Sequence, residues 1–449
     1  MRRAALAAAV GLVLADSSVV TLGLPDILRE FDATVSEVAW VLTAFNLVLA
    51  LAAVPAARWT RRRSGVALTA GLVVFAVASG LCAAAPSLPA LIANRCLQAL
   101  GGAVIVTTAL EQLVALERSE QRAIGLWGAA GVTGAAVGPA LGGVLTGAFS
   151  WEAIFIVQVP AALLIAATLV FTPAPAIEPR ATEVGGKDER PHIPANLALL
   201  LISAALTAAL FLLVLLLIEG WREPPGIAGI AVSVMPVAAL LAGLGASRLP
   251  DIRTRIEAGT IAIAGGLAAL GLMPGASLGW TVAPQVLIGA GLGLTVSALT
   301  QVALRGRSAP ALHGGWTIAA RHAGVVVGLL LLTPVFTSDL EQNAHDAQLA
   351  GTAKLIDAPL RTLHKVDLGR SIADQIRAAD GRLPDIGPAF AANPPGPGEA
   401  AAQARLRIAL QDQIDRGATH AFSTSFLLAG LLALLALVPI LTRRGELDL

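Results

Sequence analysis

The chain has 449 residues, of which 56% are hydrophobic and only 14% are charged. Soluble globular proteins carry about 25% charged residues, so the composition excludes an ordinary soluble domain and indicates an integral membrane protein. The mean hydropathy of +0.75 agrees with this interpretation. A net charge of +1 identifies no partner beyond the lipid bilayer, and we expect no nucleic acid, no metal and no cofactor.

Segments of about 20 mostly apolar residues can cross a bilayer as helices, and twelve occur in this chain. Six precede a polar linker, at 4–27, 38–57, 66–85, 89–111, 123–147 and 152–171. Six follow it, at 196–218, 226–247, 256–274, 281–303, 314–337 and 420–441. The sequence therefore predicts an all-α integral membrane protein of twelve transmembrane helices, in two six-helix bundles around a central site.

These segments divide the chain into five parts. They are an N-terminal six-helix bundle at 1–172, a cytoplasmic linker at 173–195, helices 7 to 11 at 196–337, an extracytoplasmic insert at 338–419, and helix 12 with a cytoplasmic tail at 420–449. The insert is polar but contains helical stretches, so we expect a small helical domain there. A loosely ordered loop is the alternative.

Basic residues outside the insert are distributed unevenly between the two sides of the predicted membrane. Most fall on the side of the N-terminus, and only Arg29 and Arg222 fall in the short loops on the other side. Lysine and arginine concentrate in cytoplasmic loops. We therefore expect a plasma (inner) membrane protein that crosses the bilayer many times, with both termini in the cytoplasm and residues 338–419 outside.

Asp16 lies near the middle of the first apolar segment and is the most deeply placed acidic residue in any predicted span. A charged side chain near the bilayer centre costs about 2.5–3.5 kcal/mol on insertion scales. Such residues normally face a partner or a watery cavity, so Asp16 is the first functional candidate. The alternative is a static hydrogen bond to neighbouring backbone.

Arg95 is a second charge placed deep in a span. At a rise of 1.5 Å per residue, Arg95 and Asp16 lie at similar depth in a hydrocarbon core about 30 Å thick. We expect the two side chains to communicate directly, through water or through Gln98. The alternative is a structural pair that only holds two helices together.

Several other polar residues within the spans are weaker candidates. We expect one group to line a central cavity, with hydrogen bonding across helices as the alternative: Asn46, Gln98, Gln158, Gln285 and Gln301. Glu111, Arg321 and His322 are secondary candidates for proton handling, because a histidine can titrate near neutral pH. A packed, hydrogen-bonded feature near the cytoplasmic end is the alternative for Arg321 and His322.

Glycines recur at steps of three or four residues along the fifth predicted span, including Gly134, Gly138 and Gly142. Small residues at this spacing form a smooth strip that another helix can approach closely. Pro139 removes one backbone donor and can kink the helix, and Gly143 completes the motif. Glycine packing of no special function is the alternative.

Three motifs in order resemble the major facilitator superfamily, and within it the drug:proton antiporter branch. They are Leu-Ala-Asp-Ser-Ser-Val-Val at 14–20, Arg-Cys-Leu-Gln-Ala-Leu-Gly-Gly-Ala at 95–103, and Gly-Ala-Ala-Val-Gly-Pro-Ala-Leu-Gly-Gly at 134–143. The resemblance implies that the first and fourth helices line a central cavity, and that the glycine motif marks exporters and seals the interface between the halves. One departure is Arg61, where the family has an acidic residue, and it puts the family's gating latch at 58–65 in doubt.

The resemblance implies a secondary active transporter rather than an enzyme. We expect a monomer that exports hydrophobic or amphipathic small molecules by proton antiport, through alternating access of the two bundles. Asp16 would carry the proton and Arg95 would modulate it. The alternatives are a dedicated exporter of one metabolite or lipid that uses the outer insert for handoff, and a non-transporting membrane sensor or assembly factor.

Overall fold

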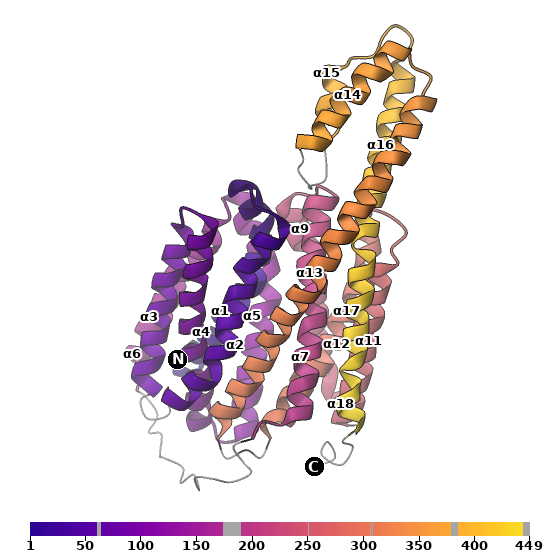
Figure 1. Ribbon diagram of the computed structural model, residues 1–449. Helices are drawn as coiled ribbons and strands as arrows, with labels where there is room; N and C mark the ends of the chain where they lie inside the picture. The colour runs from indigo at the N-terminus through magenta and orange to yellow at the C-terminus, as the bar shows by residue number, and fades with distance from the viewer. Residues whose placement is uncertain are drawn as a thin grey trace.

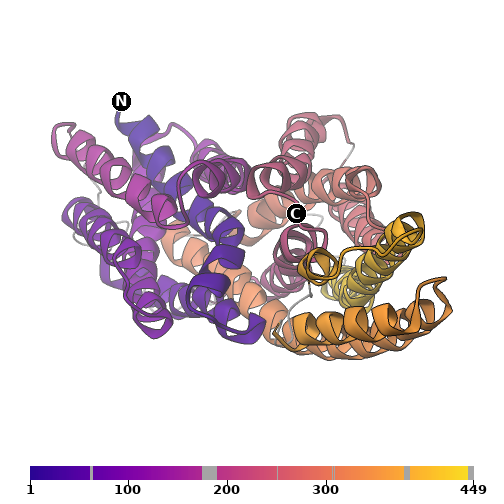
Figure 2. The same cartoon turned by 90° about the horizontal axis from the view of Figure 1, so that it is seen from above.

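The computed structural model describes residues 1–60, 64–173, 190–249, 251–305, 307, 309–378 and 385–442. Most of the predicted linker, the three arginines at 61–63 and the C-terminal tail from 443 lie outside the described residues. Every regular element within the described ranges is a helix. The helices form two bundles that stand side by side, with a pair of helical arms projecting from the second bundle (Figures 1 and 2).

The first bundle contains one helix for each of the first six predicted spans. They are α1 (Arg2–Glu30), α2 (Val35–Thr60), α3 (Ser64–Ala83), α4 (Leu88–Leu116), α5 (Glu120–Ala148) and α6 (Glu152–Val170). Arg2 donates hydrogen bonds to the backbone oxygens of Leu169 and Thr172, at 2.9 and 2.7 Å. The start of α1 therefore lies beside the end of α6, and we call this end of the bundles the linker end.

The second bundle has more interruptions. Its elements are α7 (Ile193–Thr207), η2 (Ala208–Leu212), α8 (Leu213–Leu215), η3 (Leu216–Gly220), α9 (Pro225–Val232), α10 (Val234–Gly245), η4 (Ala246–Arg248), α11 (Ile252–Gly271), α12 (Leu278–Leu304), α13 (Pro310–Asp357), α17 (Ser423–Leu435) and α18 (Leu437–Thr442). The break between α9 and α10 has a local cause, because Pro236 has no amide to donate to the carbonyl of Val232. The two helices together form one predicted span.

The all-α membrane fold predicted from the sequence is confirmed, with one qualification about the ninth span. Eleven helices in the described part of the chain are long and apolar enough to cross a membrane. α11 is not one of them, since Arg253, Arg255 and Glu257 lie in its first two turns. It nevertheless packs against α12 and α17 inside the second bundle, where the ninth span was predicted.

The two bundles repeat one packing pattern. α4 packs against α2 and α3, and α12 packs in the same way against α10 and α11. A Cβ on Gly101 of α4 would lie 2.8 Å from the carbonyl oxygen of Gly71, and Gly291 of α12 approaches Gly259 in the same manner. Gly101 and Gly291 are therefore equivalent positions in the two halves.

The predicted insert is helical, so the alternative of a loosely ordered loop is wrong. α13 does not end at the membrane but continues to Asp357, and α16 (Ala400–Ala421) runs beside it toward α17. α14 (Thr362–Ala378) and α15 (Gly387–Ala392) complete the arms, which project at the end opposite the linker end (Figure 1). Leu368, Phe390, Leu406 and Leu410 belong to a small hydrophobic core of their own.

A buried carboxylate ties the arms together. The amide of Arg361 donates to Glu399 Oε1 at 2.5 Å, and the amide of Gly396 donates to Oε2 at 3.2 Å. The hydrogen bond from the Arg361 amide holds the pKa of the Glu399 carboxyl below its usual range. At neutral pH this charged group therefore links the starts of α14 and α16.

A buried Asp–Arg cluster as the candidate functional site

Asp16 of α1 and Arg95 of α4 form an ion pair inside the first bundle. Arg95 Nη1 lies 2.5 Å from Asp16 Oδ2, and both residues have 0% of their surface exposed. The direct contact expected from their depths is present. The recorded partners of Asp16 are side chains of α4 and α6 rather than neighbouring backbone.

Two glutamines surround the carboxylate. Gln158 of α6 donates to Asp16 Oδ1 at 2.8 Å, and Gln98 of α4 lies 3.4 Å from the same oxygen. Gln98 Oε1 accepts from Arg95 Nη1 at 2.5 Å, and Gln98 Nε2 donates to Ser79 of α3 at 2.8 Å. Gln98 and Gln158 therefore form hydrogen bonds across helices in this structure, which is the alternative to lining a cavity.

The guanidinium of Arg95 is enclosed on its other sides. Its Nε donates to the backbone oxygen of Val41 at 3.3 Å, and its Cζ lies 4.0 Å from the ring centre of Phe45 and 5.7 Å from that of Phe155. A cation over an aromatic face is stabilised by the ring quadrupole. The cluster thus joins α1, α2, α3, α4 and α6, and removing one charge of a buried pair typically costs about 3–5 kcal/mol.

In the second bundle, the position on α12 that corresponds to Arg95 of α4 carries no charged side chain. Arg95 precedes Gly101 by six residues, and Gln285 precedes Gly291 by six. Gln285 is fully buried and donates to Thr281 on its own helix at 3.0 Å. Gln301, in the last turn of α12, is exposed. Of the five predicted cavity residues, only Gln98 and Gln158 therefore join the Asp16 cluster.

Asn46 joins the two bundles instead. Its Oδ1 lies 2.6 Å from His322 Nδ1 of α13, and its Nδ2 donates to the backbone oxygen of Leu42 at 2.8 Å. Asn46 and His322 are both buried. No spacing pattern in the sequence could have paired these two residues, because they are 276 positions apart.

The remaining secondary candidates lie apart from the Asp16 cluster. Glu111 is half-buried in the last two turns of α4. Arg321 is half-buried on α13 beside His322. In the described part of the chain, no group of three or more histidine, cysteine, aspartate or glutamate side chains could hold a metal ion.

The glycine motif of α5 faces two different helices. A Cβ on Gly134 would lie 2.8 Å from the carbonyl carbon of Gly11, and one on Gly142 would lie 2.5 Å from the carbonyl oxygen of Val19. Gly138 likewise approaches Ser18, two residues beyond Asp16. These three glycines therefore let α5 support the part of α1 that carries Asp16.

Only the end of the motif reaches the other bundle. A Cβ on Gly143 would lie 2.8 Å from Gly229 Cα of α9, and one on Gly229 would lie 3.1 Å from the carbonyl oxygen of Pro139. Gly143 and Pro139 therefore contact the second bundle, and their role as a seal between the halves stays a prediction. Gly134, Gly138 and Gly142 pack within the first bundle.

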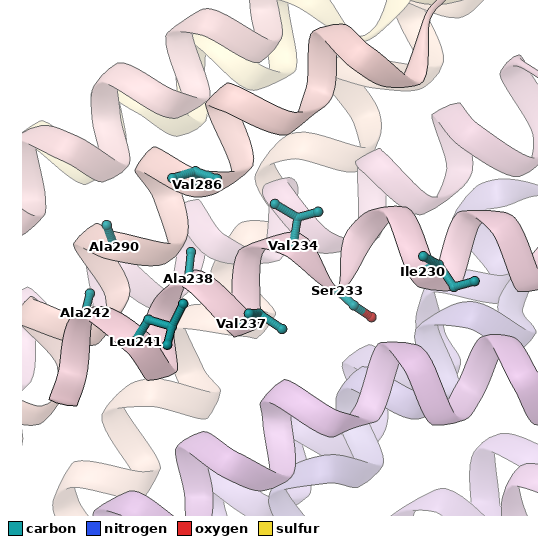
Figure 3. Close-up of a pocket in the computed structure, with 9 residues that line it drawn as sticks. All are labelled: Ile230, Ser233, Val234, Val237, Ala238, Leu241, Ala242, Val286 and Ala290. Atoms are coloured by element: carbon teal, nitrogen blue, oxygen red, sulfur yellow. The ribbon is translucent and has the colours of Figure 1, made fainter.

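An apolar pocket of about 550 Å³ lies on the second bundle, between α9, α10 and α12 (Figure 3). Its lining includes Ile230, Val237, Leu241 and Val286, which are 67%, 52%, 64% and 44% exposed. The pocket is therefore open to the surface of the molecule rather than enclosed. None of the predicted cavity residues lines this pocket.

Comparison with known proteins supports this fold. A family model described as "Major Facilitator Superfamily" matches residues 6–333. A methylenomycin A resistance protein of Bacillus subtilis (strain 168) is 33% identical over 224 residues, covering 48% of this chain and 45% of the relative. The multidrug resistance protein Stp of Mycobacterium tuberculosis (strain CDC 1551 / Oshkosh) is 34% identical over 161 residues, covering 34% and 29%. Each match thus spans less than half of the relative's length.

A solved structure matches nearly the whole chain. It is a bacterial homolog of the human lysosomal transporter Spinster, in an inward-facing and unoccupied conformation, with a TM-score of 0.62 and 16% identity. The match covers 97% of both chains. At this identity the likeness shows the arrangement of helices and says nothing about cargo.

Proposed function

Since the chain belongs to the Major Facilitator Superfamily, and is therefore a multi-pass membrane transporter rather than an enzyme, we propose that it exports hydrophobic or amphipathic small molecules in exchange for protons. Its resemblance to drug-resistance proteins favours export. The observation that carries the coupling to protons is the fully buried ion pair between Asp16 and Arg95. The chain would work as a monomer in the plasma membrane, with the linker end in the cytoplasm.

In this proposal the ion pair links protonation to helix packing. While Asp16 is ionised, it accepts hydrogen bonds from Arg95 of α4 and Gln158 of α6. Protonation removes the charge that Arg95 neutralises, and it converts one acceptor oxygen into a donor. The three helices must then rearrange or admit water, which couples the proton to the opening of the first bundle.

Contacts between the bundles at both ends support alternating access. At the linker end, Gly315 of α13 lies against Ala53 and Ala57 of α2. At the opposite end, Arg29 Nη1 of α1 lies 3.7 Å from Glu219 Oε1 of η3. Transport across the centre requires that these two sets of contacts separate in turn.

A cross-link at the linker end should stop transport. A Cβ on Gly315 would lie 3.3 Å from Ala57 Cβ, close to the 3.5–4.5 Å span of a disulfide. We therefore expect that Ala57→Cys with Gly315→Cys, in a protein whose Cys82 and Cys96 are replaced by alanine, exports amphipathic dyes from liposomes along a proton gradient when reduced. Oxidation should abolish this export, and reductant should restore it.

The two single-cysteine variants are the matched controls, since neither can form the cross-link. Full-rate export by the oxidised double variant would contradict movement of the bundles at this end. A failure of the unmodified protein to move any cargo along a proton gradient would instead support the alternative of a non-transporting sensor or assembly factor.

A further inference from the structure

Resting on the export function proposed above, we infer that Arg321 is the group that binds the acidic head of an amphipathic anion in the centre between the two bundles. The preferred cargo would then carry a carboxylate or phosphate on an apolar body. This assignment goes beyond the unspecified drug-like cargo of the proposed function.

The packing of α13 shows which way Arg321 faces. Gly315 and His322 face α2, whereas Gly324 faces α7, because a Cβ on it would lie 2.9 Å from the carbonyl carbon of Leu200. At 3.6 residues per turn, Arg321 falls between these two faces. Leu330, nine residues later and half a turn around the helix, is 52% exposed on the outer surface. Arg321 therefore lies on the side of α13 that points to the centre.

Arg321 lies at the depth in the membrane that is expected of a cargo site. Arg321 is eleven residues beyond Pro310, where α13 begins, which places it about 16 Å from the linker end at 1.5 Å per residue. Its neighbour His322 contacts Asn46 in the middle of α2. Arg321 is thus near mid-membrane, where family members of this architecture open alternately to each side.

Arg321 has no protein partner within the described residues. No hydrogen bond or ion pair there includes its guanidinium, and His322 is already engaged by Asn46. Arg95, the other deep arginine, is neutralised by Asp16. The carboxylate of Asp16 is likewise committed to Arg95, so it does not offset the charge of Arg321.

An unpaired cation within a membrane span is energetically costly because it has lost its hydration, and a bound anion would offset that cost. The planar guanidinium matches carboxylates and phosphates through two parallel hydrogen bonds. An apolar body attached to that anion suits the apolar spans on either side. The same charge opposes cationic cargo, so the geometry selects by charge as well as by hydrophobicity.

A matched probe series tests the inference by equilibrium binding to the full-length protein in detergent. The probes share one pyrene body: pyrenebutyrate, neutral pyrenebutanol, and a pyrenebutyl trimethylammonium cation. The unmodified protein should bind the carboxylate most tightly. Arg321→Gln should weaken carboxylate binding about 10- to 100-fold, the value of a charge-assisted hydrogen-bonded pair, and leave pyrenebutanol binding unchanged. Arg118→Gln removes an exposed arginine and should change neither the binding of pyrenebutyrate nor that of pyrenebutanol.

Arg321→Lys keeps the positive charge but loses the planar guanidinium with its paired donors. This variant should fold even if the glutamine variant does not. It should retain a weakened preference for the carboxylate. Equal binding of all three probes by the unmodified protein, or an unchanged preference in either Arg321 variant, would overturn the inference. Displacement of pyrenebutyrate by laurate or by lysophosphatidate tells a carboxylate head from a phosphate head. Because binding needs no proton gradient, its failure is distinguishable from a failure of the proposed antiport.

Discussion

Replacing Asp16 by asparagine is expected to abolish proton-driven export and to destabilise the protein. The substitution removes the titratable group and leaves Arg95 charged at a position with 0% exposure. Breaking a buried ion pair in this way typically costs about 3–5 kcal/mol. Thermal unfolding in detergent and gradient-driven flux in liposomes, measured on the same preparation, check both effects.

Asp26→Asn is the matched control for this substitution. Asp26 lies on the same helix, pairs with Arg29, and has a side chain that is 27% exposed. Ion pairs with such access to solvent contribute about 0–1 kcal/mol. We therefore expect little change in unfolding temperature or export, and a loss as large as that of Asp16→Asn would show that the position of the carboxylate does not matter.

A double variant separates the loss of proton coupling from the loss of stability. Asp16→Asn with Arg95→Gln removes both charges, and replacing a whole buried pair by neutral groups is often tolerated. The double variant should recover most of the lost stability while proton-driven export stays absent. Recovery of export together with stability would show that the pair only holds α1 and α4 together.

Replacing Gly134 by valine is expected to have the second large effect. A side chain there would meet the backbone of Gly11, which cannot rotate away, so α5 and α1 must separate. Overpacking of this kind costs typically about 1–3 kcal/mol, and it displaces the helix that carries Asp16. Both the unfolding temperature and the export rate should fall.

Gly128→Ala provides the control on the same helix. No atom lies within 4 Å of a Cβ at Gly128, so the added methyl meets open space. Alanine is favoured over glycine in a helix interior by about 1 kcal/mol, and the unfolding temperature should stay the same or rise. An equal loss at both positions would show that the contact with α1 does not explain the effect at Gly134.

The sequence predicted that Asp16 and Arg95 communicate, but it left open whether they do so directly, through water or through Gln98. The family resemblance placed the first and fourth helices around one cavity, and depth along each helix follows from residue number. Asp16 and Arg95 lie in spans that cross in opposite directions, and a fixed rise per residue places them at similar depth. The sequence could not predict that Gln158 completes the cluster while Gln301 stays exposed. Gln158 joins the cluster because of how α6 is rotated in its bundle, whereas Gln301 lies in the last turn of α12, away from the centre of the span.

The glycine motif of α5 was likewise predictable only in part. Its spacing predicts close helix packing, but Gly142 and Gly143 are one residue apart and therefore point about 100° apart around the helix. Gly142 meets α1 and Gly143 meets α9. Only the arrangement of the bundles decides which glycine contacts the other half.

The sequence predicted helical stretches in the insert, but not that the first of them continues the helix of the eleventh span. The apolar run stops near 337, yet α13 continues to Asp357. The polar residues that follow leave the membrane without losing helix-forming ability, so a change in hydropathy marks the membrane boundary and not the end of the helix.

The most direct measurement imposes a cargo gradient, with no initial pH difference, across liposomes that contain the purified protein and an internal pH dye. If Asp16 exchanges a proton for cargo, outward cargo flow should acidify the lumen with the unmodified protein and leave it unchanged with Asp16→Asn plus Arg95→Gln. Acidification at the same rate in both would contradict the assignment of Asp16 as the proton carrier.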